Sequence, residues 1–167
     1  MTASQRQRIV VLTDLWLERA ERLLGRAFEP VQVRFDLRGA AAGQYRTHPC
    51  PLIRFNAEMA AIQLDAFCER TPPHEVAHHV VAQLYRGRKV RPHGPEWRAV
   101  MQGFGLEPSR CHDYRVAAGS IRRQRRFRYR CGCREHELSA TRHNRVQRGE
   151  QEYLCRYCRQ ALRFRSD

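Results

Sequence analysis

The stretch "TPPHEVAHHV", residues 71–80, constrains this chain more than any other, because it places three histidines and one glutamate within six positions. On an α-helix, His74 and His78 lie at positions i and i+4, so their rings project from one face, where both can reach a single metal ion. Glu75 lies one step around the helix, beside that ion without being its ligand. There it can take a proton from a water molecule that the metal has acidified.

A catalytic zinc uses three protein ligands and one open position, so a third donor should follow the helix. We predict that this donor is His93. If the helix continues about two turns past His78, the chain overshoots by about 10 Å, and the roughly seven residues of 87–93 can retrace up to about 23 Å. Gly94 then lets the backbone turn close to the metal, and Pro95 starts the next helix.

Other polar residues near this motif remain alternatives. Glu96 is the rival third ligand, because some zinc peptidases use a glutamate from a following helix, and His112 and His48 are further candidates. His79 points about 100° away from the neighbouring ligand, so we expect it to be packed or solvent-facing. His112 or Tyr114 could also support the ligands or donate to the oxyanion, although each has a plain structural interpretation.

A second group of metal-binding residues follows near the C-terminus. "CGCREH" and "CRYC" supply five candidates for the four places of a closed structural zinc site: Cys131, Cys133, His136, Cys155 and Cys158. The C-x-x-C pair is a regular knuckle, whereas C-x-C is tighter than usual, so Cys131 pairs with either Cys133 or His136. A redox dithiol is the competing interpretation. Zinc binding would supply folding energy that about 45 residues with few aliphatic side chains lack.

The charge of the chain indicates a polyanionic partner. The formal net charge is +14, 30 of the 31 basic residues are arginine, and from residue 111 onward 15 arginines face six acidic residues. The block "RRQRRFRYR" sets aromatic rings among arginines, a combination that suits phosphate neutralisation and base stacking. The competing interpretation is a solvated basic strand. The predicted nucleic-acid contacts are Arg122, Arg123, Arg125, Arg126, Arg128 and Arg130.

Periodicity and chain breakers predict an α+β chain with two domains, 1–120 and 121–167. The first should hold an N-terminal helix, a small antiparallel or mixed sheet and the metal-binding helix, and the second should be a β-rich zinc ribbon. We expect helices at 4–25, 56–85 and 95–102, and strands at 31–38, 39–47, 52–56, 127–131, 136–140, 151–155 and 161–165.

Two of these helices carry more detailed expectations. The first should cover the sheet and end at Gly25, since its apolar residues recur every three or four positions: Ile9, Leu12, Leu15, Trp16, Leu23 and Leu24. In the helix 56–85, Asp65 is a candidate cap. Thr71 and the two prolines after it either kink this helix or restart it with Thr71 as the N-cap.

The cellular context follows from what the sequence lacks. No run of about eighteen apolar residues occurs, and the apolar stretch near the N-terminus is too short for a secretory signal. Seven cysteines, four of them in close pairs, favour a metal clip over a disulfide framework. We therefore expect a cytoplasmic monomer without membrane contact, which the positive charge could bring to the nucleoid.

Four strings in order, "HEVAHHVV", "RPHGPEW", "SRCHDY" and "YRCGCREHELSATRHNRVQRGEQEYLCRYC", resemble the SprT-like zinc metalloproteases, a family that includes the eukaryotic Spartan proteases. The resemblance implies a zincin-type metalloprotease domain with His74, His78 and His93 as ligands and Glu75 as base, followed by a zinc ribbon. In Spartan relatives the activity is DNA-dependent cleavage of proteins covalently trapped on DNA, and a basic ribbon region helps to hold the DNA.

The sequence therefore predicts a zinc-dependent endopeptidase with one catalytic and one structural zinc. Its substrates would be DNA-associated or DNA-crosslinked proteins, and its arginine-rich ribbon would contact nucleic acid, including single-stranded or junction DNA. The alternative is a non-catalytic, zinc-containing regulator that binds nucleic acid and in which both metal sites are structural. A zinc hydrolase acting on non-peptide bonds is a third interpretation, because the ligands do not specify the bond that is cleaved.

Overall fold

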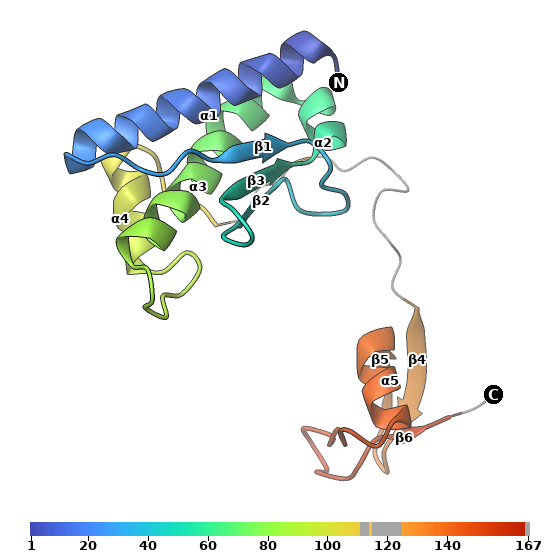
Figure 1. Cartoon of the computed structure of the whole chain (residues 1–167). Coiled ribbons are helices and arrows are strands. Elements are labelled where there is room, and N and C mark those ends of the chain that lie inside the picture. The colour runs from blue at the N-terminus through green and yellow to red at the C-terminus, as the bar shows by residue number, and fades with distance from the viewer. Residues whose placement is uncertain (111–113, 115–124, 166–167) are drawn as a thin grey trace. The chain divides into compact units, whose positions relative to one another are not determined.

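The computed structural model describes residues 1–110, 114 and 125–165, and its contacts divide the α+β chain into two units, Met1–Ile121 and Arg122–Asp167 (Figure 1). The predicted domain boundary at residue 120 lies outside the described residues. The first unit contains α1 (Ala3–Leu24), β1 (Gln32–Arg34), β2 (Gly43–Arg46), β3 (Leu52–Phe55), α2 (Ala57–Ile62), α3 (Leu64–Leu84) and α4 (Pro95–Gly103). The second contains β4 (Arg126–Arg130), β5 (Glu135–Ser139), α5 (Ala140–Gln147) and β6 (Arg163–Phe164).

Helix α1 begins and ends where its sequence predicts. Its first turn is a capping box, in which Thr2 Oγ1 accepts from the Gln5 N–H at 3.2 Å and Gln5 Oε1 accepts from the Thr2 N–H at 2.8 Å. Gly25 ends the helix in the left-handed conformation, with φ of 63°. The helix packs along α3 (Figure 1), and its buried Ile9 belongs to the same core cluster as Ile53 and Phe55 of β3.

The apolar face of α1 is narrower than its periodicity suggests. Ile9 and Ala20 are buried against α3, and Leu12 and Trp16 are partly buried. In contrast, Leu15 is 49% exposed, and Leu23 and Leu24 are exposed as well. An amphipathic surface helix buries a single stripe, so the leucines outside that stripe remain in water.

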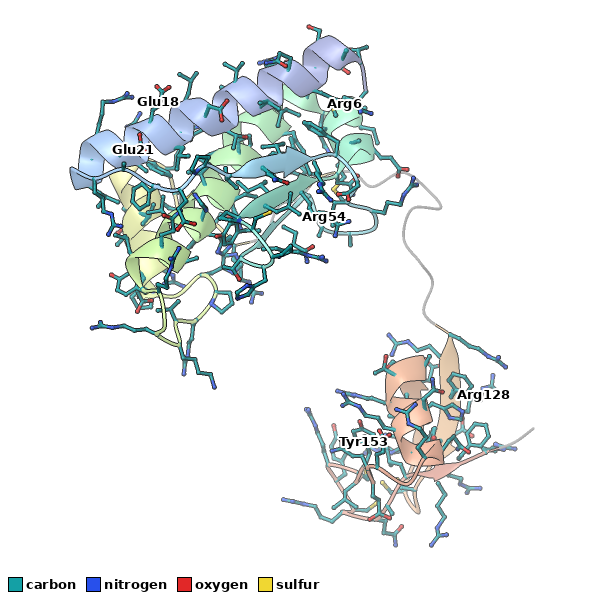
Figure 2. All side chains as sticks on the ribbon, viewed as in Figure 1. Arg6, Glu18, Glu21, Arg54, Arg128 and Tyr153 are labelled. Carbon is teal, nitrogen blue, oxygen red and sulfur yellow. The ribbon has the colours of Figure 1, made fainter. Side chains whose placement is uncertain are left out.

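The first sheet is mixed and has the strand order β1-β3-β2, with β3 parallel to β1 and antiparallel to β2. Strand β1 is shorter than predicted because its ladder with β3 covers only three residue pairs, ending at Arg34 and Arg54. Figure 2 labels Arg54, whose Nε donates to Asp36 Oδ1 at 2.7 Å. Strand β2 is left at the edge of this sheet.

The predicted helix 56–85 is two helices. The Asn56 side chain caps α2 by accepting hydrogen bonds from two main-chain N–H groups, at 3.1 and 3.2 Å. The helical conformation is interrupted at Gln63, and α3 begins at the next residue. Asp65 is not a cap, because no side-chain cap bond occurs at this helix start. Instead it lies in the first turn of α3 and pairs with Arg8 at 2.8 Å.

Helix α3 runs without interruption through Pro72 and Pro73, so of the two predicted alternatives, a kink or a restart at Thr71, the restart is wrong. Both proline rings and Thr71 are buried. The Thr71 hydroxyl lies 3.1 Å from the Tyr114 hydroxyl, which donates to the Ala66 carbonyl oxygen at 3.0 Å. Proline disfavours a helix interior because it removes a donor, so tertiary packing holds this helix together where local propensity opposes it.

The second unit is built on the sheet β5-β4-β6, in which both neighbours of β4 are antiparallel to it. Helix α5 was not predicted, although Ser139 is a normal N-cap that accepts from the Arg142 N–H at 3.4 Å. The predicted strand at 151–155 is only an isolated bridge between Leu154 and Ala161. Across the described residues, no helix is both long and apolar enough to cross a membrane.

Candidate active site

The imidazoles of His74 and His78 on α3 and of His93 after it point their Nε2 atoms toward one another. The Nε2 atoms of His74, His78 and His93 lie 3.0 Å (His93 to His74), 3.1 Å (His78 to His93) and 3.3 Å (His78 to His74) apart. A tetrahedral zinc with Zn–N bonds of 2.0–2.1 Å would set these nitrogens about 3.3 Å apart, so the trio fits one zinc ion. Among the described residues, no fourth donor joins this group, which leaves a coordination position open to a substrate or water.

The third imidazole reaches the pair through a left-handed backbone. His93 has φ of 58°, a conformation uncommon outside glycine, whereas Gly94 has φ of −71°. The turn predicted at Gly94 is therefore made by His93 itself. Gly94 is needed because the Arg91 carbonyl oxygen and Glu96 Oε2 approach its backbone closely. A Cβ atom there would lie 2.9 Å from each of them. Glu96, the rival ligand, is outside the trio.

Trp97 packs against all three imidazoles and was missed at the sequence level. Its ring centroid lies 4.7 Å from those of His74 and His93 and 5.6 Å from that of His78. Its Nε1 donates to the His74 carbonyl oxygen at 3.2 Å, and the residue is only 1% exposed. Helical spacing gives no signal for this contact, because His93 precedes the N-cap Gly94 and is not part of α4.

Burial favours the neutral, metal-binding form of His78 and His93. It lowers the pKa of His78 to about 3, with the neighbouring His74 and His93 adding to the effect. Burial also lowers the pKa of His93, helped by the positive charge of Arg110. A neutral imidazole has a free lone pair, so these shifts remove proton competition for a cation at neutral pH.

Glu75 lies in the same cleft but is not one of the three converging donors. The residue is 4% exposed, and burial raises the pKa of its carboxyl to about 8, opposed by a hydrogen bond from the main-chain N–H of Tyr45. Without a cation nearby it therefore holds a proton at pH 7. A divalent ion on the adjacent imidazoles would favour the ionised form, which is the state a general base requires.

The cleft has a volume of about 900 Å³ and is open to solvent between β2, α3 and the segments on either side of α4. Tyr114 lines it, but its hydroxyl is engaged by α3 at the Ala66 carbonyl oxygen. His79 is buried away from the trio, with Nε2 2.7 Å from the Glu29 carbonyl oxygen. Of the two predicted options, packed or solvent-facing, the structure shows the packed one. His48 is exposed and outside the trio, and His112 lies outside the described residues.

Comparison with known proteins decides the family. The SprT-like family profile matches residues 13–114, which contain the trio, Glu75 and Trp97. The chain belongs to the SprT-like family. Its relatives include Protein SprT of Pseudomonas savastanoi pv. phaseolicola, 40% identical over 150 residues that cover 88% of each chain. Protein SprT of Pseudomonas paraeruginosa is 42% identical over 149 residues, 87% of each chain. No solved structure matches the chain.

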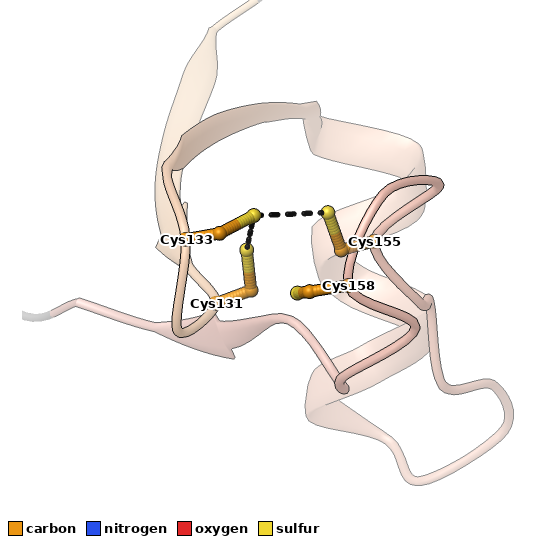
Figure 3. A group of neighbouring side chains, drawn as sticks. All are labelled: Cys131, Cys133, Cys155 and Cys158. Atoms are coloured by element: carbon orange, nitrogen blue, oxygen red, sulfur yellow. Dashed lines mark hydrogen bonds between the residues drawn. The ribbon is translucent and has the colours of Figure 1, made fainter.

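The second unit of this SprT-like chain carries a group of four cysteines whose sulfurs point toward one another (Figure 3). Cys133 Sγ lies 3.5 Å from Cys131 Sγ and 3.7 Å from Cys155 Sγ, and Cys158 completes the group. Zn–S bonds of about 2.3 Å in a tetrahedron imply S···S distances of about 3.8 Å, so the group is compatible with a structural zinc. His136 is the fifth candidate, and its Nε2 lies 3.2 Å from Cys131 Sγ, where it can donate to the sulfur.

The predicted nucleic-acid residues are only partly on one surface. Arg122 and Arg123 lie outside the described residues, and Arg125 packs over the Phe127 ring at 4.9 Å. Alternation along β4 exposes Arg126, Arg128 and Arg130 on one face, and Figure 2 labels Arg128. Their cross-strand partners on β5 are Ser139, Glu137 and Glu135. Because paired residues share a face, two carboxylates lie beside these arginines and reduce their positive field.

Proposed function

We propose that this chain is a zinc-dependent endopeptidase with a zincin-type catalytic unit. The convergence of three imidazole nitrogens within 3.3 Å of one another carries the proposal. Two further features support it: the buried carboxylate of Glu75 one residue along the same helix, and an open cleft that both groups line. Membership of the SprT-like family favours a metalloprotease over the other zinc hydrolases that such a ligand set permits.

A zinc ion held by the trio would polarise the scissile carbonyl and acidify a water molecule in the cleft. Glu75 accepts the proton of that water as its oxygen attacks the carbonyl carbon. When the C–N bond breaks, Glu75 returns the proton to the leaving nitrogen, so the carboxylate is regenerated. The Tyr45 main-chain N–H and the walls of the cleft hold the carboxylate in place during both transfers.

We further propose that the second unit brings this site to DNA-associated or DNA-crosslinked proteins. The exposed Arg126, Arg128 and Arg130 of β4 support this proposal, together with a formal net charge of +14 for the whole chain. Guanidinium groups neutralise phosphates independently of sequence, so the substrate would be selected by its location on DNA. Single-stranded and junction DNA are the forms to test first.

The deciding experiment compares the wild type with Glu75→Gln on a DNA-bound protein substrate, with and without DNA, and measures bound zinc in each preparation. We expect Glu75→Gln to keep its zinc and to lose cleavage by about 10²- to 10⁴-fold, because the proton acceptor is gone. Glu96→Gln is the matched control, since Glu96 does not line the cleft. Equal cleavage by both proteins would exclude Glu75 as the base.

Binding of DNA without cleavage by the wild-type protein would instead favour the non-catalytic regulator. The structural feature against that interpretation is that no described residue adds a fourth donor to the imidazole trio, since purely structural zinc sites are closed by four protein ligands. The same assay therefore separates the two functions.

A further inference from the structure

Strand β2 presents an open edge beside the catalytic carboxylate. In the first sheet, β3 is the only described strand that pairs with it, so its other edge meets no described strand. The Asn56 N–H donates to the Ala42 carbonyl oxygen at 2.8 Å. This bond shows that Ala42, and with it Gln44 and Arg46, turn their main-chain N–H and C=O groups toward β3. Because the pattern alternates in an antiparallel ladder, Gly43 and Tyr45 turn their N–H and C=O groups toward the open edge.

Gly43 and Tyr45 also face α3, and their spacing along β2 matches the spacing of Glu75 and His79 along α3. The rings of Tyr45 and His79 meet edge-on, 5.3 Å between centroids, and the Tyr45 hydroxyl lies 3.2 Å from His79 Nδ1. Gly43 lies two residues before Tyr45, a step of about 6.8 Å along the strand. Glu75 lies four residues before His79, a step of about 6.0 Å along the helix. These steps nearly match, so the contact of Tyr45 with His79 sets Gly43 opposite Glu75.

No side chain fits at position 43 while Glu75 keeps its place. A Cβ atom there would lie 2.6 Å from Cγ and 2.7 Å from Cδ of Glu75, inside the 3.0 Å that real Cβ atoms respect. The backbone itself does not demand glycine, since Gly43 is not among the residues with positive φ. The three atoms nearest to that Cβ all belong to Glu75, so the Glu75 side chain excludes alanine at this position.

We propose that Gly43 is a positioning residue for Glu75, whose carboxylate can lie against the open edge of β2, beside the imidazole trio, only because position 43 has no side chain. The catalytic consequence rests on the proposed function, whereas the packing of Gly43 against Glu75 does not. Position 43 thus links the edge strand to the catalytic helix.

The first test is Gly43→Ala with kinetics on the same DNA-bound protein substrate. We expect kcat to fall about 100-fold because the carboxylate is displaced by about 1 Å, while KM and zinc content stay near the wild-type values. The matched control is Gly103→Ala, where the nearest atom to a new Cβ is Leu23 Cδ1 at 3.9 Å, and it should cleave normally. A wild-type kcat for Gly43→Ala would overturn the proposal.

The second test does not depend on proteolysis. Gly43→Ala should lower the melting temperature of the holoprotein in the wild-type background but leave it unchanged or raised in a Glu75→Ala background, where the space is free. An equal loss in both backgrounds would overturn the proposal. If the single variant does not fold, the double variant must fold, and failure of both would also overturn it. If the wild type cleaves nothing, the proposed function fails, and this cycle still decides the contact.

Discussion

Removing the charge of Glu75 should stabilise the zinc-free protein in a manner that depends on pH. The perturbation is Glu75→Gln, which keeps the size of the side chain and removes its titration. Burial raises the pKa of this carboxyl from 4.5 to about 8 in the folded chain. Between pH 4.5 and 8 the unfolded chain has lost this proton while the folded chain keeps it, so the free energy of unfolding falls as pH rises.

The magnitude follows from the size of that change. A pKa that moves from 4.5 to about 8 corresponds to on the order of 5 kcal/mol, fully expressed above pH 8 and absent below pH 4.5. The variant should therefore match the wild type near pH 4.5 and exceed it progressively toward pH 8. Zinc on the adjacent imidazoles favours the ionised carboxylate, so adding zinc should shrink the difference.

The assay is urea unfolding of chelator-treated protein at several pH values, followed by tryptophan fluorescence. Both tryptophans, Trp16 and Trp97, lie in the unit Met1–Ile121, so the signal reports the unit that contains Glu75. Both proteins carry the same histidines, whose titration cancels in the difference, and Glu96→Gln corrects for the exchange of a glutamate for a glutamine. A stability difference that stays constant between pH 5 and 8 would show that burial does not hold the proton on Glu75.

Three further predictions test the neighbouring sites. Trp97→Phe should weaken zinc binding at the trio about tenfold in a chelator competition, because the hydrogen bond from the indole N–H to the His74 main-chain carbonyl oxygen is lost. Unchanged zinc affinity would show that Trp97 does not position the imidazoles. We expect the four cysteines of the second unit to bind one zinc ion, so Cys155→Ser should lower the zinc content while His136→Ala leaves it unchanged, as measured by metal analysis; loss in both variants would make His136 a ligand. Replacing Arg128 and Arg130 by alanine should flatten the slope of log DNA affinity against log salt by up to about 2, whereas an unchanged slope would place the DNA elsewhere.

The fold illustrates where local rules suffice. The limits of α1 follow from a capping box and a terminal glycine, both of which act within a few residues, and the sequence analysis predicted the end at Gly25. The course of α3 through Pro72 and Pro73 could not be predicted, because intrinsic propensity there favours a break. Only burial of the proline rings against the rest of the unit offsets that preference.

The active site divides in the same way. The sequence by itself placed His74, Glu75 and His78 on one turn, since the helical repeat fixes neighbours four positions apart. It predicted His93 as the third ligand from the reach of the loop, and a loop of that reach can deliver other side chains as well. The structure brings the His93 ring beside the other two through a left-handed turn and contact with the Trp97 ring.

The burial of Glu75 was beyond any local pattern. It depends on Gly43, thirty-two positions earlier, and on the register that Tyr45 and His79 set between strand and helix. On β4 the sequence correctly showed alternating arginines, but the carboxylates of β5 that lie beside them emerged only from strand pairing. Spacing along a chain fixes which side chains share a face, whereas what that face meets is determined by the packing of distant segments, which no short-range repeat encodes.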